Sequence, residues 1–316
     1  MNTNTSKRYG AMYGQAIGDA LGVPIEFKKR REIEDLFPQG GPFDYAKDIR
    51  THDNFEPGEW SDDTEQALCI LYAYLEGDPN TPIEQQIAKQ IHRWFTEDGK
   101  GCGGHTREVV THKLFLETPL QASQEVWEGR DRGSAPNGGV MRTAAVGIIN
   151  PWDLNWTENA AVSCCAVTHF DPRCVASAVA VSIAIAGLIQ GWAIKDVTNE
   201  AMERAFKYNA EVIPFIRTKD LGALDLDREG IGYTYKCMGA GFWALRKFEE
   251  QGDFLTCLVD ILREGGDTDT NGAVAGALLG AACGVDHIPQ GLVDGLQKRA
   301  ELHEMISRVC LRRPKP

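Results

Sequence analysis

The sequence predicts an all-α protein, a compact orthogonal bundle of helices. Strict alternation of apolar and polar residues, the pattern of a half-buried strand, is almost absent from the chain. Apolar residues instead recur at helical spacing between turns rich in glycine and proline. No linker or shift in composition divides the sequence, so we expect a single domain over residues 1–316.

The charge balance and the cysteines narrow the functional class. The chain has 33 Lys and Arg against 45 Asp and Glu, a formal net charge of −12. Because nucleic-acid affinity rests largely on basic residues, we expect no nucleic-acid partner.

The nine cysteines include no CxxC pair, and most lie in apolar runs, among them Cys164 and Cys283. Buried thiols of this kind are typical of a reducing compartment, and the N-terminus lacks a secretory signal, so we expect a cytoplasmic protein.

The first helix is expected within residues 8–26, where small and apolar residues such as Ala11, Gly14 and Gly18 recur at helical spacing. Pro24 ends it and leaves Glu26 just beyond. A carboxylate in that place is a solvated loop residue unless something draws it inward. Residues 28–59 are charged and rich in proline and glycine, so we expect a long loop.

The next helix begins with an acidic motif, residues 60–65. Two carboxylates and two hydroxyls, from Ser61 to Thr64, precede an apolar helix. Asp62 with Glu65 fits a capping box, in which two side chains satisfy the free N–H groups of a helix start.

The middle of the chain contains helices expected over residues 83–95, 143–149 and 158–167, and two glycine-rich segments. Residues 97–110 would either wrap a ligand or form a flexible loop. Residues 134–142 would form a nest of backbone N–H groups that binds phosphate, or a plain N-cap turn. Residues 174–189 are apolar on every face but shorter than the ~20 residues of a membrane span, so we expect a core helix and no membrane partner.

Two connecting segments in the second half of the chain contain further candidate residues. His169 lies where one helix ends, and Asp171 as N-cap with Pro172 in the first turn starts the next helix. Tyr233 lies on a glycine-flexed loop and is suited either to stacking on a base or to packing on a neighbour. Helices are expected over residues 236–250, 254–263 and 295–311.

The most informative segment is residues 265–280. Asp267 and Asp269 alternate with Thr268 and Thr270 directly before a run of Ala, Gly, Val and Leu. Thr270 or its neighbour Asn271 can serve as N-cap, but one cap needs one oxygen and the segment offers four. Hard cations such as Mg²⁺ bind several oxygen ligands. If this segment meets residues 60–65, the carboxylates repel one another unless cations hold them, so a binuclear oxygen-ligand site is the favoured interpretation.

Five motifs together resemble the ADP-ribosylglycohydrolase family: GDALGVPIEF, SDDT, APNGGVMR, THFDPR and GGDTDTNGAVAGALLG, in this order from about Gly10 to Gly284. The resemblance implies an all-α fold and a binuclear Mg²⁺ centre, with Mn²⁺ as an alternative. The implied metal ligands are Ser61, Asp62 and Asp63 in one group and Asp267, Asp269 and Thr270 in the other.

The resemblance also implies the remaining site residues. Glu26 matches the acid beside the metals and the scissile bond, and Glu26, Asp63 and Asp267 are the implied catalytic residues. The implied substrate-binding residues are Ser134, Asn137, Gly138 and Gly139 for the diphosphate or distal ribose, His169 beside the ligand, Tyr233 on the adenine, and Gly101 and Gly103 in the glycine-rich loop. That loop departs from the family pattern, because Cys102 or His105 stands where arginine-directed members place an acid.

The implied reaction is hydrolysis of the glycosidic bond between ADP-ribose and a protein side chain, with arginine favoured as that side chain. Serine-linked or other O-linked ADP-ribose is the alternative substrate. A non-catalytic ADP-ribose-binding protein and a metal hydrolase of phosphate esters are the rival classes. The expected partner is an ADP-ribosylated protein or a small ADP-ribosyl conjugate, bound by a monomer.

Overall fold

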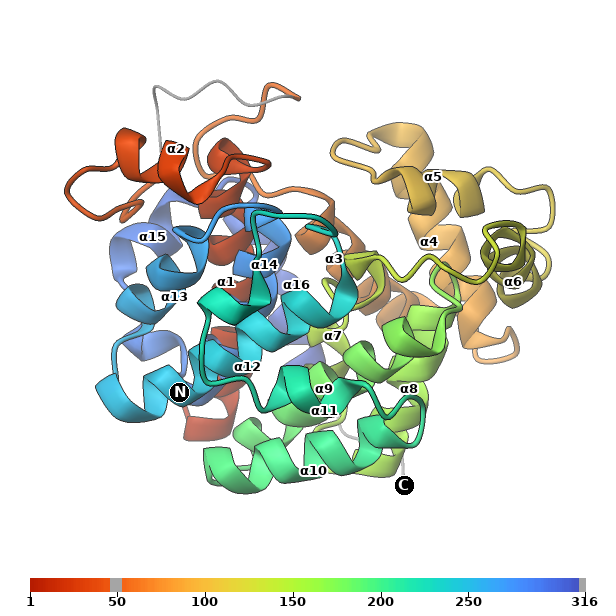
Figure 1. The fold of residues 1–316 in the computed structure, drawn as a ribbon. Helices are drawn as coiled ribbons and strands as arrows, with labels where there is room; N and C mark the ends of the chain where they lie inside the picture. Colours follow the sequence, from red (N-terminus) through yellow and green to blue (C-terminus); the bar gives the residue numbers. More distant parts are fainter. Residues whose placement is uncertain (46–52, 313–316) are drawn as a thin grey trace.

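The computed structural model describes residues 1–45 and 53–312, and this part of the chain is all-α (Figure 1). The prediction of the fold class is confirmed. The α-helices are α1 (Thr3–Gly22), α2 (Arg30–Leu36), α3 (Asp62–Glu76), α4 (Ile83–Glu97), α5 (Gly104–Val110), α6 (Pro119–Gly129), α7 (Ala144–Ile149), α8 (Leu154–Ala166), α9 (Pro172–Ile189), α10 (Ile194–Phe206), α11 (Val212–Ile216), α12 (Thr234–Gln251), α13 (Phe254–Leu262), α14 (Thr268–Cys283), α15 (Gln290–Gly295) and α16 (Arg299–Leu311). Extended pairing within residues 1–45 and 53–312 is limited to isolated bridges.

The helices α1 and α14, from opposite ends of the sequence, lie side by side and antiparallel (Figure 1). Their contact is backbone to backbone: a Cβ added at Gly14 would lie 2.1 Å from Gly276 O, and one added at Gly18 would lie 1.9 Å from Gly272 O. Only glycine allows so close an approach. This glycine stripe, the row of facing glycines on α1 and α14, ends where Gly22 lies against Asp269. It therefore brings the end of α1 to the acidic start of α14.

Helix α9 is the core helix that its composition predicts. Its residues from Cys174 to Ile189 are buried, and it packs against α7, α8, α10, α12 and α14. By length and apolar composition, Pro172–Ile189 would also pass as a membrane span, but 89% of it is buried inside the protein. The predicted N-cap is confirmed, because the Asp171 side chain accepts a hydrogen bond from Arg173 N and Pro172 stands in the first turn.

Several predicted boundaries are wrong. The expected loop over residues 28–59 contains α2, which is started by a bond from Lys29 N to Glu32 Oε2; residues 46–52 of that loop lie outside the described part. The glycine-rich segment over residues 97–110 contains α5. The last helix begins at Arg299 rather than Gly295, because Leu296 is extended, Gln297 N donates to Gly58 O, and Lys298 adopts φ +25° directly before the helix. Cys283, predicted to be buried, is half-exposed.

Candidate active site

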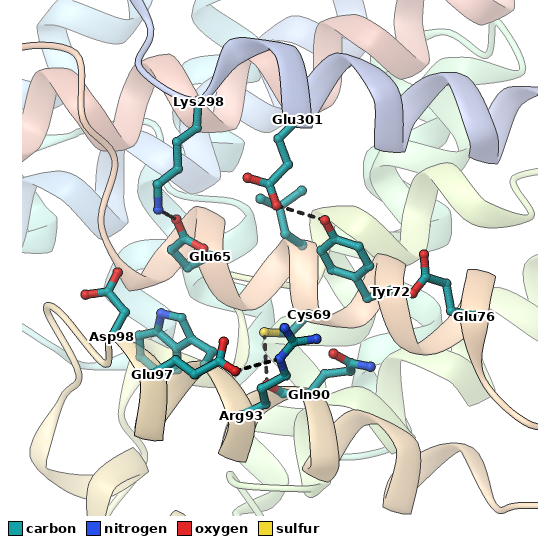
Figure 2. A pocket seen from close by; sticks show the side chains of 12 residues that line it. Glu65, Cys69, Tyr72, Glu76, Gln90, Arg93, Glu97, Asp98, Lys298 and Glu301 are labelled. Carbon is teal, nitrogen blue, oxygen red and sulfur yellow. Dashed lines mark hydrogen bonds and ion pairs between the residues drawn. The ribbon is translucent and has the colours of Figure 1, made fainter.

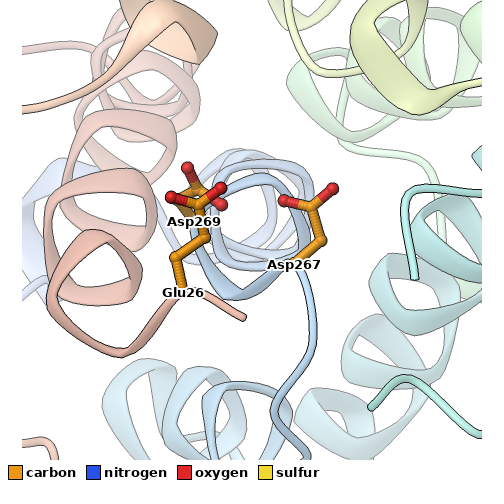
Figure 3. Close-up of side chains that lie close together, drawn as sticks. All are labelled: Glu26, Asp267 and Asp269. Carbon is orange, nitrogen blue, oxygen red and sulfur yellow. The ribbon is translucent and has the colours of Figure 1, made fainter. Parts of the chain in front are cut away.

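Three carboxylates meet at the start of α14. Oxygens of Glu26, Asp267 and Asp269 all lie within 4.8 Å of one another (Figure 3). Asp267 is the N-cap of α14 and Asp269 stands in its first turn, so the prediction of Thr270 or Asn271 as N-cap is wrong. Glu26 comes from the other side of the contact, directly after the short 3₁₀-helix Val23–Ile25 that follows α1.

The loop after Glu26 is what draws this carboxylate inward. Phe27 N donates to Gly266 O at 2.7 Å, and Gly266 N donates to Lys28 O at 2.9 Å. These bonds tie the loop to the segment directly before Asp267. They hold Phe27 at φ +62°, a conformation that is rare for a bulky residue and that is found mostly at functional sites.

The acidic start of α3 joins the same cluster. Ser61 is the N-cap of α3 and accepts from Asp63 N, and Thr270 Oγ1 lies 3.4 Å from Asp63 Oδ2. The two acidic segments therefore converge, as the sequence predicts. The capping box proposed for Asp62 and Glu65 is wrong: the Glu65 carboxylate instead accepts from the Trp60 indole N–H at 2.9 Å.

Asp19 is a functional candidate that sequence reasoning missed. It is completely buried in α1, where its carboxylate accepts hydrogen bonds from Ser61 N at 2.8 Å and from Thr64 Oγ1 at 2.6 Å. This anion at the start of α3 positions the turn that carries the acidic motif. The signal available in the sequence is an aspartate among the glycines and apolar residues of the first helix, a face on which a charged residue needs buried partners.

One cavity gathers most of the predicted site residues. Those that line it are Glu26, Asp62, Gly101, Gly103, Asn137, Gly138, His169, Asp267, Asp269 and Thr270. Phe27, Asp53, Cys102, His105, Thr106 and Met141 also line it, together with Gly104 and Pro136. Ser61, Asp63, Ser134, Gly139 and Tyr233 are not among the lining residues. Within the cavity wall, Asn137 Nδ2 donates to Asp267 Oδ2 at 2.8 Å.

Tyr233 lies beside the cavity wall. Thr234 N donates to Ala135 O at 3.1 Å and Asn137 N donates to Gly232 O at 2.9 Å, so the two predicted ligand loops pair with each other. The Tyr233 ring packs edge-on against Phe215, at 6.0 Å between centroids. Tyr233 therefore packs on a neighbouring side chain, which is one of the two arrangements that the sequence allows; the other is stacking on a base.

Burial and mutual repulsion raise the pKa of these carboxyl groups. Burial first, then the neighbouring Asp267 and Asp62, raise the pKa of Glu26 to about 9. The pKa values of Asp62, Asp63 and Asp269 also lie well above the usual range, for the same two reasons. Asp63 Oδ1 is buried and has no hydrogen-bond partner among the described residues. An oxygen-rich cluster in which one carboxylate oxygen of Asp63 is buried without a described partner fits a hard divalent cation.

Metal-free protein is expected to lose stability as the pH rises from about 6 to 9. The folded-state pKa of Glu26, about 9, lies above its unfolded value of about 4.3. The contribution of neutral Glu26 to the free energy of unfolding is therefore fully present below the pKa of the unfolded state. It is lost as the pH rises through the pKa of the folded state. Thermal unfolding in EDTA at several pH values measures this loss, and Mg²⁺ or Mn²⁺ should raise Tm most at the alkaline end. A Tm in EDTA that rises with pH would contradict the prediction.

A second cavity lies between α3, α4 and α16 (Figure 2). Acidic side chains line it as well, but cations stand beside them. Lys298 Nζ lies 2.6 Å from Glu65 Oε1, and Arg93 Nε lies 3.0 Å from Glu97 Oε1. Cations pair with Glu65 and Glu97 here, whereas Asp63 in the acidic cluster keeps a buried carboxylate oxygen without a described partner, so the cavity beside Glu26 is the stronger candidate for a cation-dependent site.

A solved structure described as an ADP-ribosylglycohydrolase-related protein complex has this fold, with a TM-score of 0.71 over 98% of each chain. At 24% sequence identity, this likeness shows the fold alone.

Curated relatives match almost the whole chain. The ADP-ribosylarginine hydrolase Tri1 of Serratia proteamaculans is 25% identical over 98% of this chain and 80% of its own length. The ADP-ribosyl-[dinitrogen reductase] glycohydrolase of Rhodospirillum rubrum is 26% identical over 92% of this chain and 90% of its own length.

The fold is that of proteins related to the ADP-ribosylglycohydrolases, enzymes that hydrolyse the glycosidic bonds of ADP-ribose. The family model for ADP-ribosylglycohydrolase matches residues 1–316. The chain therefore belongs to the ADP-ribosylglycohydrolase family.

Proposed function

We propose that this protein hydrolyses the bond between ADP-ribose and an arginine side chain, releasing free ADP-ribose. The observation that carries the proposal is the cluster of Glu26, Asp267 and Asp269 in a cavity that Asn137, Gly138 and other predicted ligand residues also line. Two relatives support it by their names, as an ADP-ribosylarginine hydrolase and an ADP-ribosyl-[dinitrogen reductase] glycohydrolase.

Asp53 supports arginine as the leaving group. It lines the cavity, and its Oδ2 accepts a hydrogen bond from Gly101 N at 3.2 Å. The glycine-rich loop itself contributes Cys102 and His105 rather than an acid, so Asp53 supplies a carboxylate at that loop from another part of the chain. A carboxylate is the natural partner of a planar guanidinium.

The proposed cofactor is a pair of Mg²⁺ ions, with Mn²⁺ as the alternative. One ion would be held by Ser61, Asp62 and Asp63, and the other by Asp267, Asp269 and Thr270. Glu26 lies close enough to Asp267 and Asp269 to bind the same ion as they do. When bound, such ions neutralise the carboxylates and supply Lewis-acid stabilisation to the ribose hydroxyls.

The side chains around the ions have separate roles in the proposed mechanism. Asn137 and Gly138 bind the diphosphate or distal ribose, and His169 contacts the ligand beside them. Glu26 carries the proton exchanged with the attacking water and the leaving group. Asp267, which lines the cavity, is the alternative proton carrier, whereas Asp63 lies outside the lining and would act as an ion ligand. The reaction passes through an oxocarbenium-like transition state.

The deciding experiment measures release of ADP-ribose from arginine-linked and serine-linked peptides, each with Mg²⁺ and with EDTA. We expect release from the arginine-linked peptide with Mg²⁺ alone. Glu26→Gln should lower turnover by about 100-fold or more while ADP-ribose binding stays measurable. Release in EDTA would contradict the proposed cofactor, and full turnover by Glu26→Gln would contradict the proton role.

Serine-linked ADP-ribose is the second candidate substrate, and one observation favours it. His105 and Cys102 line the cavity, and burial lowers the pKa of His105 and raises the pKa of Cys102 to about 12. Both side chains are therefore neutral at physiological pH and suit an uncharged hydroxyl leaving group. Release from the serine-linked peptide alone would replace arginine by serine in the proposal.

A further inference from the structure

The guanidinium of Arg142 is completely buried and connects α3 with the end of α8. Its Nη1 donates to Gln66 Oε1 at 2.6 Å on the α3 side. Its Nη2 donates to Thr168 Oγ1, also at 2.6 Å, and to Cys164 O at 2.9 Å, at the end of α8. A buried charge with this many partners determines the direction of the hydrogen bonds around it, because a guanidinium donates and never accepts.

That direction decides where the Thr168 hydroxyl proton lies. Thr168 Oγ1 accepts from Arg142, and it lies 2.7 Å from His169 Nδ1. In the described part of the chain these are its two hydrogen-bond partners, so the hydroxyl proton is satisfied only by donation to His169 Nδ1. Nδ1 then carries no proton, and the proton of the neutral ring lies on Nε2.

The protonated nitrogen of His169 faces the cavity wall at Gly138. A Cβ added at Gly138 would lie 2.9 Å from His169 Nε2, and Gly138 and His169 both line the cavity. Burial, followed by the neighbouring His105 and Arg142, holds the pKa of His169 well below its usual value, so the ring stays neutral. The cavity therefore receives a fixed N–H donor from this ring.

We propose that Arg142 and Thr168 are positioning residues that keep His169 in the Nε2–H form, as a hydrogen-bond donor to an oxygen of bound ADP-ribose. The identity of the ligand rests on the proposed function, whereas the position of the proton does not. Arg142 orients Gln66 in the same way. Because Gln66 Oε1 accepts from Arg142, the Gln66 amide N–H donates to Asp62 Oδ2 at 2.9 Å. One guanidinium thus orients both a ligand-binding ring and a carboxylate of the acidic cluster.

The test combines a tautomer measurement with ligand affinity. In ¹⁵N-labelled protein without ligand, NMR should show His169 protonated at Nε2, with its signals assigned by comparison with His169→Gln. Thr168→Val removes the donor to Nδ1 but keeps the shape, so the population of the Nε2–H form should fall. ADP-ribose binding, measured by calorimetry with Mg²⁺, should weaken about fivefold to tenfold, the effect of one hydrogen bond.

Thr168→Ser is the matched control, since it restores the hydroxyl and should restore both the tautomer and the affinity. A wild-type His169 protonated at Nδ1 would overturn the inference, even if Thr168→Val failed to fold. An unchanged tautomer and affinity in Thr168→Val would overturn it as well. Wild-type protein that does not bind ADP-ribose would contradict the proposed function instead, and the tautomer of the unliganded ring would still decide this inference.

Discussion

Asp269→Asn is expected to abolish hydrolysis while making the metal-free protein more stable. Asp269 is buried, and its oxygens lie within 4.8 Å of those of Glu26 and Asp267. A neutral amide cannot replace a carboxylate in holding a hard cation, so kcat/KM should fall by about 10³-fold, the equivalent of roughly 4 kcal/mol. Without metal, the same change replaces a carboxyl group whose ionisation is opposed by burial and by its acidic neighbours, so Tm in EDTA should rise by about 2 °C or more.

The matched control for this variant is Asp253→Asn. Asp253, another aspartate at a helix start, is the N-cap of α13, where its side chain accepts from Thr256 N at 2.7 Å. Asparagine caps a helix as well as aspartate does, so this variant should retain activity and stability. Mg²⁺ titration by calorimetry should show binding lost in Asp269→Asn and kept in Asp253→Asn. Normal Mg²⁺ binding by Asp269→Asn would remove Asp269 from the proposed ligands.

Gly14→Val is expected to destabilise the protein more than any single change in a side-chain contact. A Cβ at position 14 would lie 2.1 Å from Gly276 O, and the obstructing atom is backbone that cannot change rotamer. The helices α1 and α14 must separate to admit the side chain, so we expect a loss of about 3 kcal/mol or more in the free energy of unfolding. Chemical denaturation monitored by circular dichroism measures the loss.

Gly129→Ala provides the control for this prediction. Gly129 ends α6, and a Cβ there would meet nothing within 4 Å. Alanine favours a helix over glycine, so stability should stay the same or rise by up to about 1 kcal/mol. Equal stability of Gly14→Val and Gly129→Ala would mean that α1 and α14 do not meet as described.

The sequence predicts the helices better than it predicts their partners. Local patterns are enough for the all-α class, the core helix α9 and the cap formed by Asp171 and Pro172. The same patterns place the start of α14 too late, because Gly265 and Gly266 both adopt φ +78° and turn the chain so that Asp267 becomes the N-cap. That geometry depends on pairing with the loop after Glu26, which no local pattern contains.

The site is predicted in part for the same reason. Two acidic motifs before apolar helices are visible in the sequence, and the structure brings them together through Thr270 and Asp63. Asp53 lines the cavity beside Gly101, whose N–H donates to its carboxylate, and Asp19 is recognisable as an anchor only once α1 lies beside α3. Long-range contacts of this kind follow from which helix faces pack together, and spacing along one helix does not determine that.

The glycine stripe between α1 and α14 also raises the question of how the two helices find their alignment. Gly10, Gly14 and Gly18 meet Gly280, Gly276 and Gly272, so glycines recur every fourth residue on both helices. A shift by four residues would again bring Gly10 opposite Gly276 and Gly14 opposite Gly272, while displacing one acidic segment from the other by about 6 Å.

Close packing alone therefore does not distinguish the productive alignment from its neighbour. Polar contacts at the two ends of the pair do: Thr268 Oγ1 donates to Gly22 O at 2.8 Å, and Ser6 Oγ donates to Asp286 Oδ2 at 2.6 Å. Both bonds form in a single alignment, the one that places Glu26 beside Asp269. Two hydroxyl groups outside the catalytic chemistry thus select the register in which the active site exists.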